Sequence, residues 1–404
     1  MKRLILIFAF CISCAQTDDT IVTPSKINYT ISNIHETAYV PWSIEFVDSE
    51  TIIYSERRGK LFLLKNGIAT EINGVPDVFN KNQGGLLDIE LHPNFSENKK
   101  IYISYSKSNE NDEANTAIAS AKLFENKLED LKIIYLGEEM TSKRLHFGSR
   151  LQFDNDGHLY FTIGDRGNRD QNPQDISRDG GKVYRINEDG SIPEDNPFVN
   201  EKVAKKAIYS YGHRNPQGMF KHPVTGQIWT NEHGPRGGDE INIVESGKNY
   251  GWPKITYGIN YSGTTITNDK DLDGMEQPLY YWVPSIAPSG FEYINSEKYD
   301  NWNGSILVGS LKFMYLERLV LDKNNKVIYR EKVAENVGRV RDVKLSPDGY
   351  IYLAIDNKGI FKVKFLESCV LVSTSEGKTS EYFGAIVTSS KVSASFIGTI
   401  IFYI

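Results

Sequence analysis

Apolar and polar residues alternate in short runs along most of this 404-residue chain, and the alternation predicts β-strands with one buried face. The runs recur as a unit about six times. Each unit has an alternating strand, a turn of Pro, Asp and Gly, a second strand with an aromatic residue, and a later strand led by Gly. The third copy is LQFDNDGHLYFTIGD (151–165) followed by GGKVYRI (180–186), and the sixth is VKLSPDGYIYLAID (343–356) followed by GIFKVKF (359–365).

Four further copies complete the series: 44–56 with 59–64, 87–106, 218–232, and 290–311 with 316–321. Short strands in units of this size predict an all-β chain folded as a six-bladed β-propeller over residues 26–366. The segment KINYTISNI (26–34) precedes the first unit and is placed to supply the outer strand of the sixth blade. Residues 255–287 break the repeat and are interpreted as a long insertion, either a substrate-side loop or a dimer contact.

Composition supports the all-β class and argues against a protein that binds nucleic acid. Aromatic residues make up 12% of the chain, with 33 Gly and 15 Pro, which favours strands and turns over helices. The net charge of −6 and the pI near 5.8 leave no basic surplus with which to coat nucleic acid. Nucleic acid is therefore not an expected partner.

The two ends of the chain differ from the repeat. Residues 1–14 combine two cations, an apolar run and a lipobox-like Cys14, which predicts a signal peptide and either acylation of Cys14 or plain cleavage. We expect an exported protein, periplasmic or attached to the outer membrane as a lipoprotein. Removal of Cys11 and acylation of Cys14 would leave Cys369 as the only thiol, so no internal disulfide is expected. Residues 367–404 are a C-terminal extension whose structure the sequence leaves open.

Candidate chemistry gathers in three loops: GHRNPQG (212–218), EHGPRGGDEIN (232–242) and NYGWP (249–253). They are too polar for a core and too rich in Gly and Pro for a helix, so they predict a site built from loops on a rigid scaffold. His146 precedes an inner strand and is a candidate base, with a structural role as its alternative. Arg339 and Arg341 alternate along one strand and would share a face, with an anion between them; the alternative is two exposed cations on an outer strand.

These loops, together with LHFGSRL (145–151) and IGDRG (163–167), resemble the soluble quinoprotein glucose and sorbosone dehydrogenases, from about Tyr39 to Phe365. That family consists of propeller enzymes that use pyrroloquinoline quinone (PQQ) and calcium. They oxidise aldose sugars at the anomeric carbon to lactones and pass the electrons to an external acceptor such as a quinone or cytochrome. The resemblance implies the same activity, cofactors and partners here, and leaves a homodimer open.

The resemblance also implies roles for particular residues. His146 is the implied base and Asp165 its carboxylate partner, where the residues alone allow a turn aspartate. The implied PQQ contacts are Gln83, His146, Arg214, Asn215, Gln217, Ser285, Lys312, Arg339 and Arg341. The implied ligands of the catalytic calcium are the carbonyl groups of Gly234 and Pro235, with Glu240 and Tyr250 in a second, structural calcium site. Asp239 would be a polar wall beside the substrate.

The match has gaps, and other functions remain open. In WVPSIAPS (282–289), Val283 and Ser285 stand where the family has Trp and Thr, so Val283 lacks an indole to stack on sugar or cofactor. The alternatives are a cofactor-free propeller that binds a protein or glycan, and a calcium-dependent sugar lactonase. The retained cations count against both, because unpaired buried charges are costly and a lactonase needs carboxylates around its metal. The sugar itself is not determined.

Overall fold

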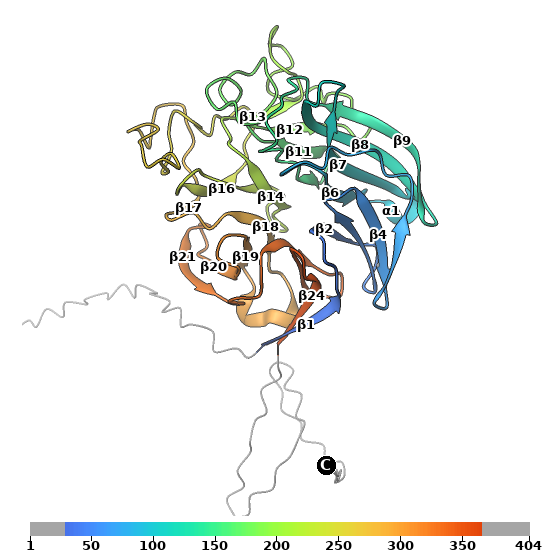
Figure 1. Cartoon of the computed structure of the whole chain (residues 1–404). Helices are drawn as coiled ribbons and strands as arrows, with labels where there is room; N and C mark the ends of the chain where they lie inside the picture. Colours follow the sequence, from blue (N-terminus) through green and yellow to red (C-terminus); the bar gives the residue numbers. More distant parts are fainter. Residues whose placement is uncertain (1–28, 366–404) are drawn as a thin grey trace, which may run out of the picture.

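The computed structural model describes residues 29–365. These residues form six four-stranded antiparallel sheets arranged in a ring, as Figure 1 shows. The prediction of an all-β, six-bladed propeller is confirmed. The predicted signal peptide with Cys14, and the extension 367–404 with Cys369, lie outside the described residues.

The strands follow the repeats found in the sequence. Blades one to three contain β2 (Pro41–Phe46), β3 (Thr51–Glu56), β4 (Lys60–Lys65) and β5 (Ile68–Ile72); β6 (Leu86–Leu91), β7 (Lys100–Ser108), β8 (Ala114–Phe124) and β9 (Lys127–Leu136); and β10 (Leu151–Phe153), β11 (Leu159–Ile163), β12 (Lys182–Ile186) and β13 (Ile208–Tyr211).

Blades four to six contain β14 (Pro216–Lys221), β15 (Ile228–Glu232), β16 (Asp239–Ile243) and β17 (Tyr280–Trp282); β18 (Pro288–Tyr293), β19 (Ser305–Ser310), β20 (Leu316–Leu321) and β21 (Val327–Lys332); and β22 (Val340–Leu345), β23 (Ile351–Ile355) and β24 (Gly359–Phe365), completed by β1 (Tyr29–His35). The helices of the described residues are α1 (Phe95–Asn98) and the 3-10 helix η1 (Glu297–Trp302), and neither is long enough to cross a bilayer.

The N-terminal strand closes the ring. β1 pairs antiparallel with β24, from Tyr29 opposite Phe365 to His35 opposite Ile360. The sixth blade thus joins the two ends of the described chain, and the free edge of β24 is covered. The prediction that the segment 26–34 supplies this outer strand is confirmed for its described residues, from Tyr29 onward.

The insertion at 255–287 requires one correction. Its last part is regular, because Tyr280–Trp282 forms β17 and pairs with β16 as the outer strand of the fourth blade. The side chain of Trp282 is buried and its Nε1 donates to Glu317 Oε2 of β20 at 2.9 Å, so this indole packs between the fourth and fifth blades. Val283, the next residue, is 63% exposed.

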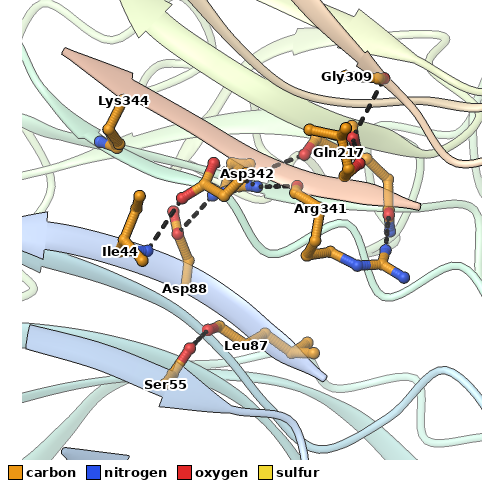
Figure 2. Close-up of polar contacts among 12 residues, drawn as sticks. Ile44, Ser55, Leu87, Asp88, Gln217, Gly309, Arg341, Asp342 and Lys344 are labelled. Carbon is orange, nitrogen blue, oxygen red and sulfur yellow. Dashed lines mark hydrogen bonds and ion pairs between the residues drawn. The ribbon is translucent and has the colours of Figure 1, made fainter. Parts of the chain in front are cut away.

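Polar side chains tie neighbouring blades together at corresponding positions of the second strands. The hydroxyl groups of Ser55, Ser104 and Thr162 each donate to a main-chain carbonyl at the inner strand of the following blade, at 2.5, 2.6 and 3.2 Å. Asn231 Nδ2 does the same to Ser289 O at 2.7 Å. Figure 2 shows the first of these links, from Ser55 to Leu87. The links fix each blade against the next.

A buried guanidinium joins the inner strands near the axis. Arg150 donates Nη1 to Asp88 Oδ1 at 2.8 Å and Nη2 to Asp342 Oδ1 at 2.9 Å. The other oxygens of the two aspartates accept from Leu151 N at 2.7 Å and Ile44 N at 3.0 Å. Figure 2 shows Asp88 and Asp342 in this network, facing each other from β6 and β22. The ion pairs therefore join three blades, and the hydrogen bond from Ile44 N adds a fourth.

Candidate active site

One end of the ring gathers the candidate residues, because of the blade topology. In each antiparallel blade the first residues of the inner strand lie beside the last residues of the second strand. His146, Arg214, Ser285 and Arg339 precede inner strands, whereas Asp165, Gly234, Lys312 and Asp356 follow second strands. All blades have the same strand order, so these loops meet around the same mouth of the axial channel.

His146 and Asp165 form a close pair. Nδ1 of the imidazole lies 2.7 Å from Asp165 Oδ1, and the side chains are 15% and 2% exposed. Oδ1 also accepts from Gly167 N at 2.7 Å, and Oδ2 accepts from Trp252 Nε1 at 2.9 Å. A carboxylate held in this way keeps the proton of the neutral imidazole on Nδ1 and leaves the lone pair of Nε2 available to accept a proton.

Electrostatics keeps this pair in the state that a base needs. Burial, together with the positive charge of Arg214, lowers the pKa of His146 below its ordinary value, although Asp165 acts in the opposite direction. Burial acts to raise the pKa of Asp165, but hydrogen bonding to His146 and the nearby Arg214 charge outweigh it, so the pKa of this carboxyl is lowered. The imidazole is thus neutral and the carboxylate charged near neutral pH.

The main chain around His146 is tightly constrained. His146 has φ +54°, in the left-handed region. Its N–H donates to Gln83 Oε1 at 2.7 Å, and Asn215 Oδ1 accepts from Gly148 N at 3.1 Å. A Cβ added to Gly164 would lie 2.4 Å from His146 O, so glycine is required where the strand end of β11 passes this loop. Gln83 and Asn215, predicted as cofactor contacts, are placed here as supports of the base.

Cations surround the mouth next to the sixth blade. Arg339 Nε and Arg341 Nη2 contact the same oxygen of Asp356, at 3.2 and 2.8 Å, so the two arginines lie side by side as predicted. The anion between them is supplied by the chain itself. Arg341 Nη1 also reaches Gln217 Oε1 at 3.5 Å. Burial opposes charge on Asp356, but the neighbouring Arg341 and Arg339 lower its pKa overall.

Two further cations, Lys312 and Arg57, give the mouth a surplus of positive charge. The Lys312 ammonium is exposed and forms no ion pair within residues 29–365; it lies 5.0 Å from the centre of the Phe313 ring. Arg57, at the end of β3, is half-buried, and burial and the charge of Arg341 lower its pKa. Asp356 is the carboxylate that faces both arginines of the pair. The surplus can accept an anionic ligand.

The Gly234–Pro235 turn is held by Asp239. This buried carboxylate accepts from Gly234 N at 2.8 Å and from Ser285 Oγ at 2.8 Å through Oδ1. Its Oδ2 accepts from Ile286 N at 2.7 Å and Ala287 N at 2.8 Å. Burial raises the pKa of Asp239. Both carboxylate oxygens of Asp239 are therefore occupied by hydrogen bonds that join the turn to the loop that carries Ser285.

Of the two carbonyl groups predicted as calcium ligands, that of Gly234 lies beside a guanidinium. Arg214 Nη1 donates to His233 O at 2.9 Å and to Gly234 O at 2.8 Å. Pro235 O has a 3.4 Å contact with Ser285 Oγ. Each carbonyl oxygen has two lone pairs, so both retain capacity for an oxygen-preferring cation.

A small cavity lies beside Glu232 and Glu240, and Tyr250 and Thr256 also line it. Glu232 is saturated: it accepts from His213, Asn242 and the main chain of Arg214. Glu240 has only a 3.5 Å contact with Asn242 Nδ2, and burial next to Glu232 raises its pKa well above the ordinary value. Glu240, buried beside a second carboxylate and with one weak contact in the described chain, suits a bound cation.

Sequence reasoning missed several residues of this site. Asp356, Glu232 and Trp252 are partners of predicted residues from other segments. Glu232 and Trp252 lie within loops already marked as polar, and Asp356 ends the strand pattern of the sixth repeat. Arg57 lies at a blade position equivalent to other site residues, since it follows the second strand of the first blade. That shared position was the signal that could have found it.

Fold and site together define a class: a six-bladed propeller in which loops at one mouth hold a His–Asp pair beside a surplus of cations. A family model described as Glucose / Sorbosone dehydrogenase matches residues 38–362, and the chain belongs to this family. The resemblance seen in the sequence is confirmed, and the chain is an oxidoreductase of the sugar dehydrogenase type.

Relatives cover most of the chain. Aldose sugar dehydrogenase YliI of Escherichia coli (strain K12) is 40% identical over 325 residues, which cover 78% of this chain and 87% of that protein. Quinoprotein glucose dehydrogenase B of Acinetobacter calcoaceticus is 29% identical over 411 residues, covering 81% and 85%. The crystal structure of the soluble aldose sugar dehydrogenase from Escherichia coli in the apo-form matches with a TM-score of 0.79 at 36% identity, covering 83% of this chain and 99% of that one.

Proposed function

We propose that this protein oxidises aldose sugars at the anomeric carbon to lactones, using PQQ and calcium, and passes the electrons to an external acceptor. The observation that carries the proposal is the neutral His146, oriented by Asp165 and placed at a mouth rich in cations. The names of two relatives, an aldose sugar dehydrogenase and a quinoprotein glucose dehydrogenase, support the substrate class and the cofactor class.

His146 is the proposed base. Because Nδ1 faces Asp165 Oδ1, the imidazole accepts the proton of the anomeric hydroxyl at Nε2. Asp165 stabilises the imidazolium that results, and Trp252 Nε1 and Gly167 N hold the carboxylate in place. The protein therefore supplies proton removal and orientation.

The cation surplus fits PQQ, which carries three carboxylates. Lys312 would contribute an ammonium without a protein partner, and Arg339 and Arg341 would contribute guanidinium groups already oriented by Asp356. Gln217 adjoins this cluster at 3.5 Å from Arg341 Nη1, and Arg214 precedes the same strand, β14. When bound, PQQ supplies the acceptor for the hydride that leaves the anomeric carbon. Ser285 and Asn215 are proposed to keep the surrounding loops in place.

For calcium, the carbonyl oxygens of Gly234 and Pro235 are the proposed protein ligands at the cofactor, with Asp239 as the residue that holds their turn. Asp239 was predicted to line the substrate. Its hydrogen bonds favour the positioning role. Glu240 and Tyr250 are the proposed contacts of a second calcium in the small cavity beside Glu232.

The axial carboxylates do not favour the lactonase alternative. Asp88 and Asp342, the aspartates of the axial cluster, each form an ion pair with Arg150. A metal on the axis would have to displace this buried guanidinium, which is costly.

Replacing His146 tests the proposal. In holoenzyme matched for PQQ content, His146→Ala should lower aldose turnover by about 10²- to 10⁴-fold while PQQ still binds, because the cations and the Gly234 and Pro235 carbonyl groups are untouched. Asp165→Asn should lower the rate through the same imidazole. The measurement is steady-state oxidation with an artificial electron acceptor.

The double variant supplies the control. If the two residues act as one unit, His146→Ala combined with Asp165→Asn should lose little beyond the single His146 change. Near-parental turnover in His146→Ala would remove this residue from the mechanism. Multiplicative losses in the double variant would show that Asp165 acts independently.

Export, acylation of Cys14 and homodimer formation remain proposals drawn from the sequence. An acylated chain at a membrane surface would be near membrane quinones, which suits an enzyme that needs an external acceptor.

A further inference from the structure

We propose that Arg166 is a positioning residue that holds the backbone on both sides of His146 and so aims the imidazole. The inference rests on the proposed role of His146 as the base. Arg166 directly follows Asp165 in the chain, but its side chain turns into the interior and is fully buried. It lies within the motif IGDRG (163–167), where the sequence assigned a role to Asp165 and none to Arg166.

The guanidinium contacts the residues that flank His146. Nη1 donates to the carbonyl oxygen of Leu145, the residue before it, and Nη2 donates to Lys143 O at 3.0 Å. The guanidinium carbon lies 3.5 Å from the centre of the Phe147 ring, the residue after it. Nη2 also donates to Ala114 O at 3.1 Å, which ties the loop to β8 of the second blade.

The backbone held in this way is an uncommon one. His146 has φ +54°, and Gly148 and Ser149 follow with φ +62° and +88°. A non-glycine residue in the left-handed region persists only where its surroundings over-determine it. Gln83 fixes the N–H of His146, and Thr116 Oγ1 donates to Phe147 O at 2.7 Å. Arg166 adds contacts to the carbonyl group of Leu145 and the ring of Phe147.

Arginine is also an unexpected residue at position 166 if its role is purely structural. Its contacts within residues 29–365 are carbonyl groups and one aromatic ring, and Nε has no hydrogen-bond partner. Burial lowers the pKa of Arg166 to about 9, with Asp165 the carboxylate that offsets this. A buried cation without a contacting carboxylate is costly. A fork that reaches three carbonyl groups at once accounts for arginine at this position.

The charge has a second consequence for His146. The groups that act on the imidazole are Asp165, which favours its protonation, and Arg214 and Arg166, which oppose it together with burial. Across the mouth His233 is held neutral, because burial and Arg214 lower its pKa to about 3. Loss of the Arg166 charge should therefore make His146 easier to protonate.

The test compares three variants of the full-length holoenzyme. Arg166→Met removes both charge and fork, Arg166→Lys keeps the charge and loses the fork, and Arg178→Met is a matched control in the same loop, where Arg178 contacts Asn172. We expect kcat to fall about ten- to a hundredfold in both Arg166 variants, with KM and PQQ affinity within about threefold of the parent. Arg178→Met should retain the parental kcat.

The pH profile separates positioning from charge. A base must be unprotonated, so the acid limb of kcat follows the pKa of His146. The limb should move to higher pH in Arg166→Met and stay near the parental position in Arg166→Lys. A general loss of packing would lower kcat without this difference between the variants.

An NMR titration of the His146 ring keeps the inference separate from the proposed reaction. With labelled histidine in the full chain, and the signal assigned through His146→Gln, Arg166→Met should raise the imidazole pKa and change the Nδ1 signal. These readouts need no turnover, so a parent protein without aldose oxidation would count against the proposed function alone. Parental ring signals and parental kcat in folded Arg166→Met would overturn the inference.

If Arg166→Met does not fold, the variants Arg166→Lys and Phe147→Leu test the inference instead. The second removes the ring on which the guanidinium stacks and leaves all charges in place. A several-fold loss of kcat with altered His146 signals in both is the expected result. Parental values in both would overturn the inference.

Discussion

At the scale of single residues, the cations at the mouth differ in what they contribute. Lys312 has no carboxylate partner in the described chain, whereas Arg341 makes two hydrogen bonds to the buried Asp356. The first residue is therefore free to serve a ligand. The second also holds a buried carboxylate in its charged form.

This difference predicts two outcomes. Lys312→Ala should weaken PQQ binding about tenfold or more and leave stability unchanged, because it removes one charge-assisted contact worth roughly 1.5 to 3 kcal/mol. Arg341→Ala should weaken binding similarly and also lower the free energy of unfolding by roughly 3 kcal/mol, since Asp356 keeps only Arg339. PQQ titration and urea unfolding measure the two effects.

Lys323→Ala, at an exposed lysine in the same blade, is the control and should change neither quantity. Parental PQQ affinity in both Lys312→Ala and Arg341→Ala would mean that the cofactor binds elsewhere or not at all.

At the scale of the elements, the inner strands carry a second charged cluster away from the mouth. Lys344 on β22 forms an ion pair with Glu45 on β2, and the charges of Glu45 and Glu90 raise its pKa well above the ordinary value against the effect of burial. Glu292 on β18 is close enough for the charges of Lys344 and Glu45 to act on it. Burial raises its pKa to about 7, although Lys344 acts to lower it.

The raised pKa of Glu292 predicts a pH-dependent stability. In the unfolded chain a glutamate has a pKa of about 4.3. Between that pH and about 7, the folded state therefore holds a proton that the unfolded state has released. Stability is then lost as pH rises through this window. Glu292→Gln should raise the free energy of unfolding by roughly 1 to 3 kcal/mol at pH 8 and by little at pH 4.

Unfolding curves at several pH values measure this effect, with Glu50→Gln at an exposed position as the control. An equal gain at pH 4 and pH 8 would show that packing, and not charge, explains the change.

At the scale of the whole molecule, closure of the ring joins segments more than 300 positions apart. Besides its ladder with β24, β1 contributes Tyr29, whose hydroxyl donates to Val333 O at 2.9 Å and whose ring meets Trp302 edge-on. Ile31 packs against the same core cluster. This strand therefore completes a blade and covers the edge of β24 at the same time.

Truncation tests the role of closure. A chain that starts after His35 should lose roughly 3 kcal/mol or more of stability, from the apolar side chains of β1 that are no longer buried, and should self-associate through the exposed edge of β24. A chain that starts at Lys26 is the matched control. Thermal unfolding and light scattering measure both, and a monomeric, equally stable short chain would contradict the prediction.

Much of the architecture was predictable because it is local. Period-two alternation and turn residues are properties of short segments, and six similar segments indicate six blades. The outer strand at 26–34 was found in the same way, from its position before the first unit. β17 was missed because Tyr280–Trp282 is only three residues long and follows a long irregular loop.

The candidate site was predictable only in part. Residue type and motif pointed to His146 and Asp165, and the structure brings them together. The same reasoning expected a ligand anion between Arg339 and Arg341, where the structure places Asp356. Arg57 and Arg166 were not marked: the position of Arg57 after a second strand was not used, and within IGDRG (163–167) only Asp165 was assigned a role.

The sequence by itself therefore determined the number of blades, the segment that closes the ring, the family, and the residue types of the base and the cations. Tertiary structure alone decided which charges pair within the chain, as Arg339 and Arg341 pair with Asp356, and which have no carboxylate partner in the described residues, as with Lys312. It also decided that Arg166 lies against the loop of His146. The physical reason is distance along the chain: periodicity is set by neighbouring residues, whereas the partner of a buried charge is chosen when blades pack, as for Arg341 and Gln217, which are 124 positions apart.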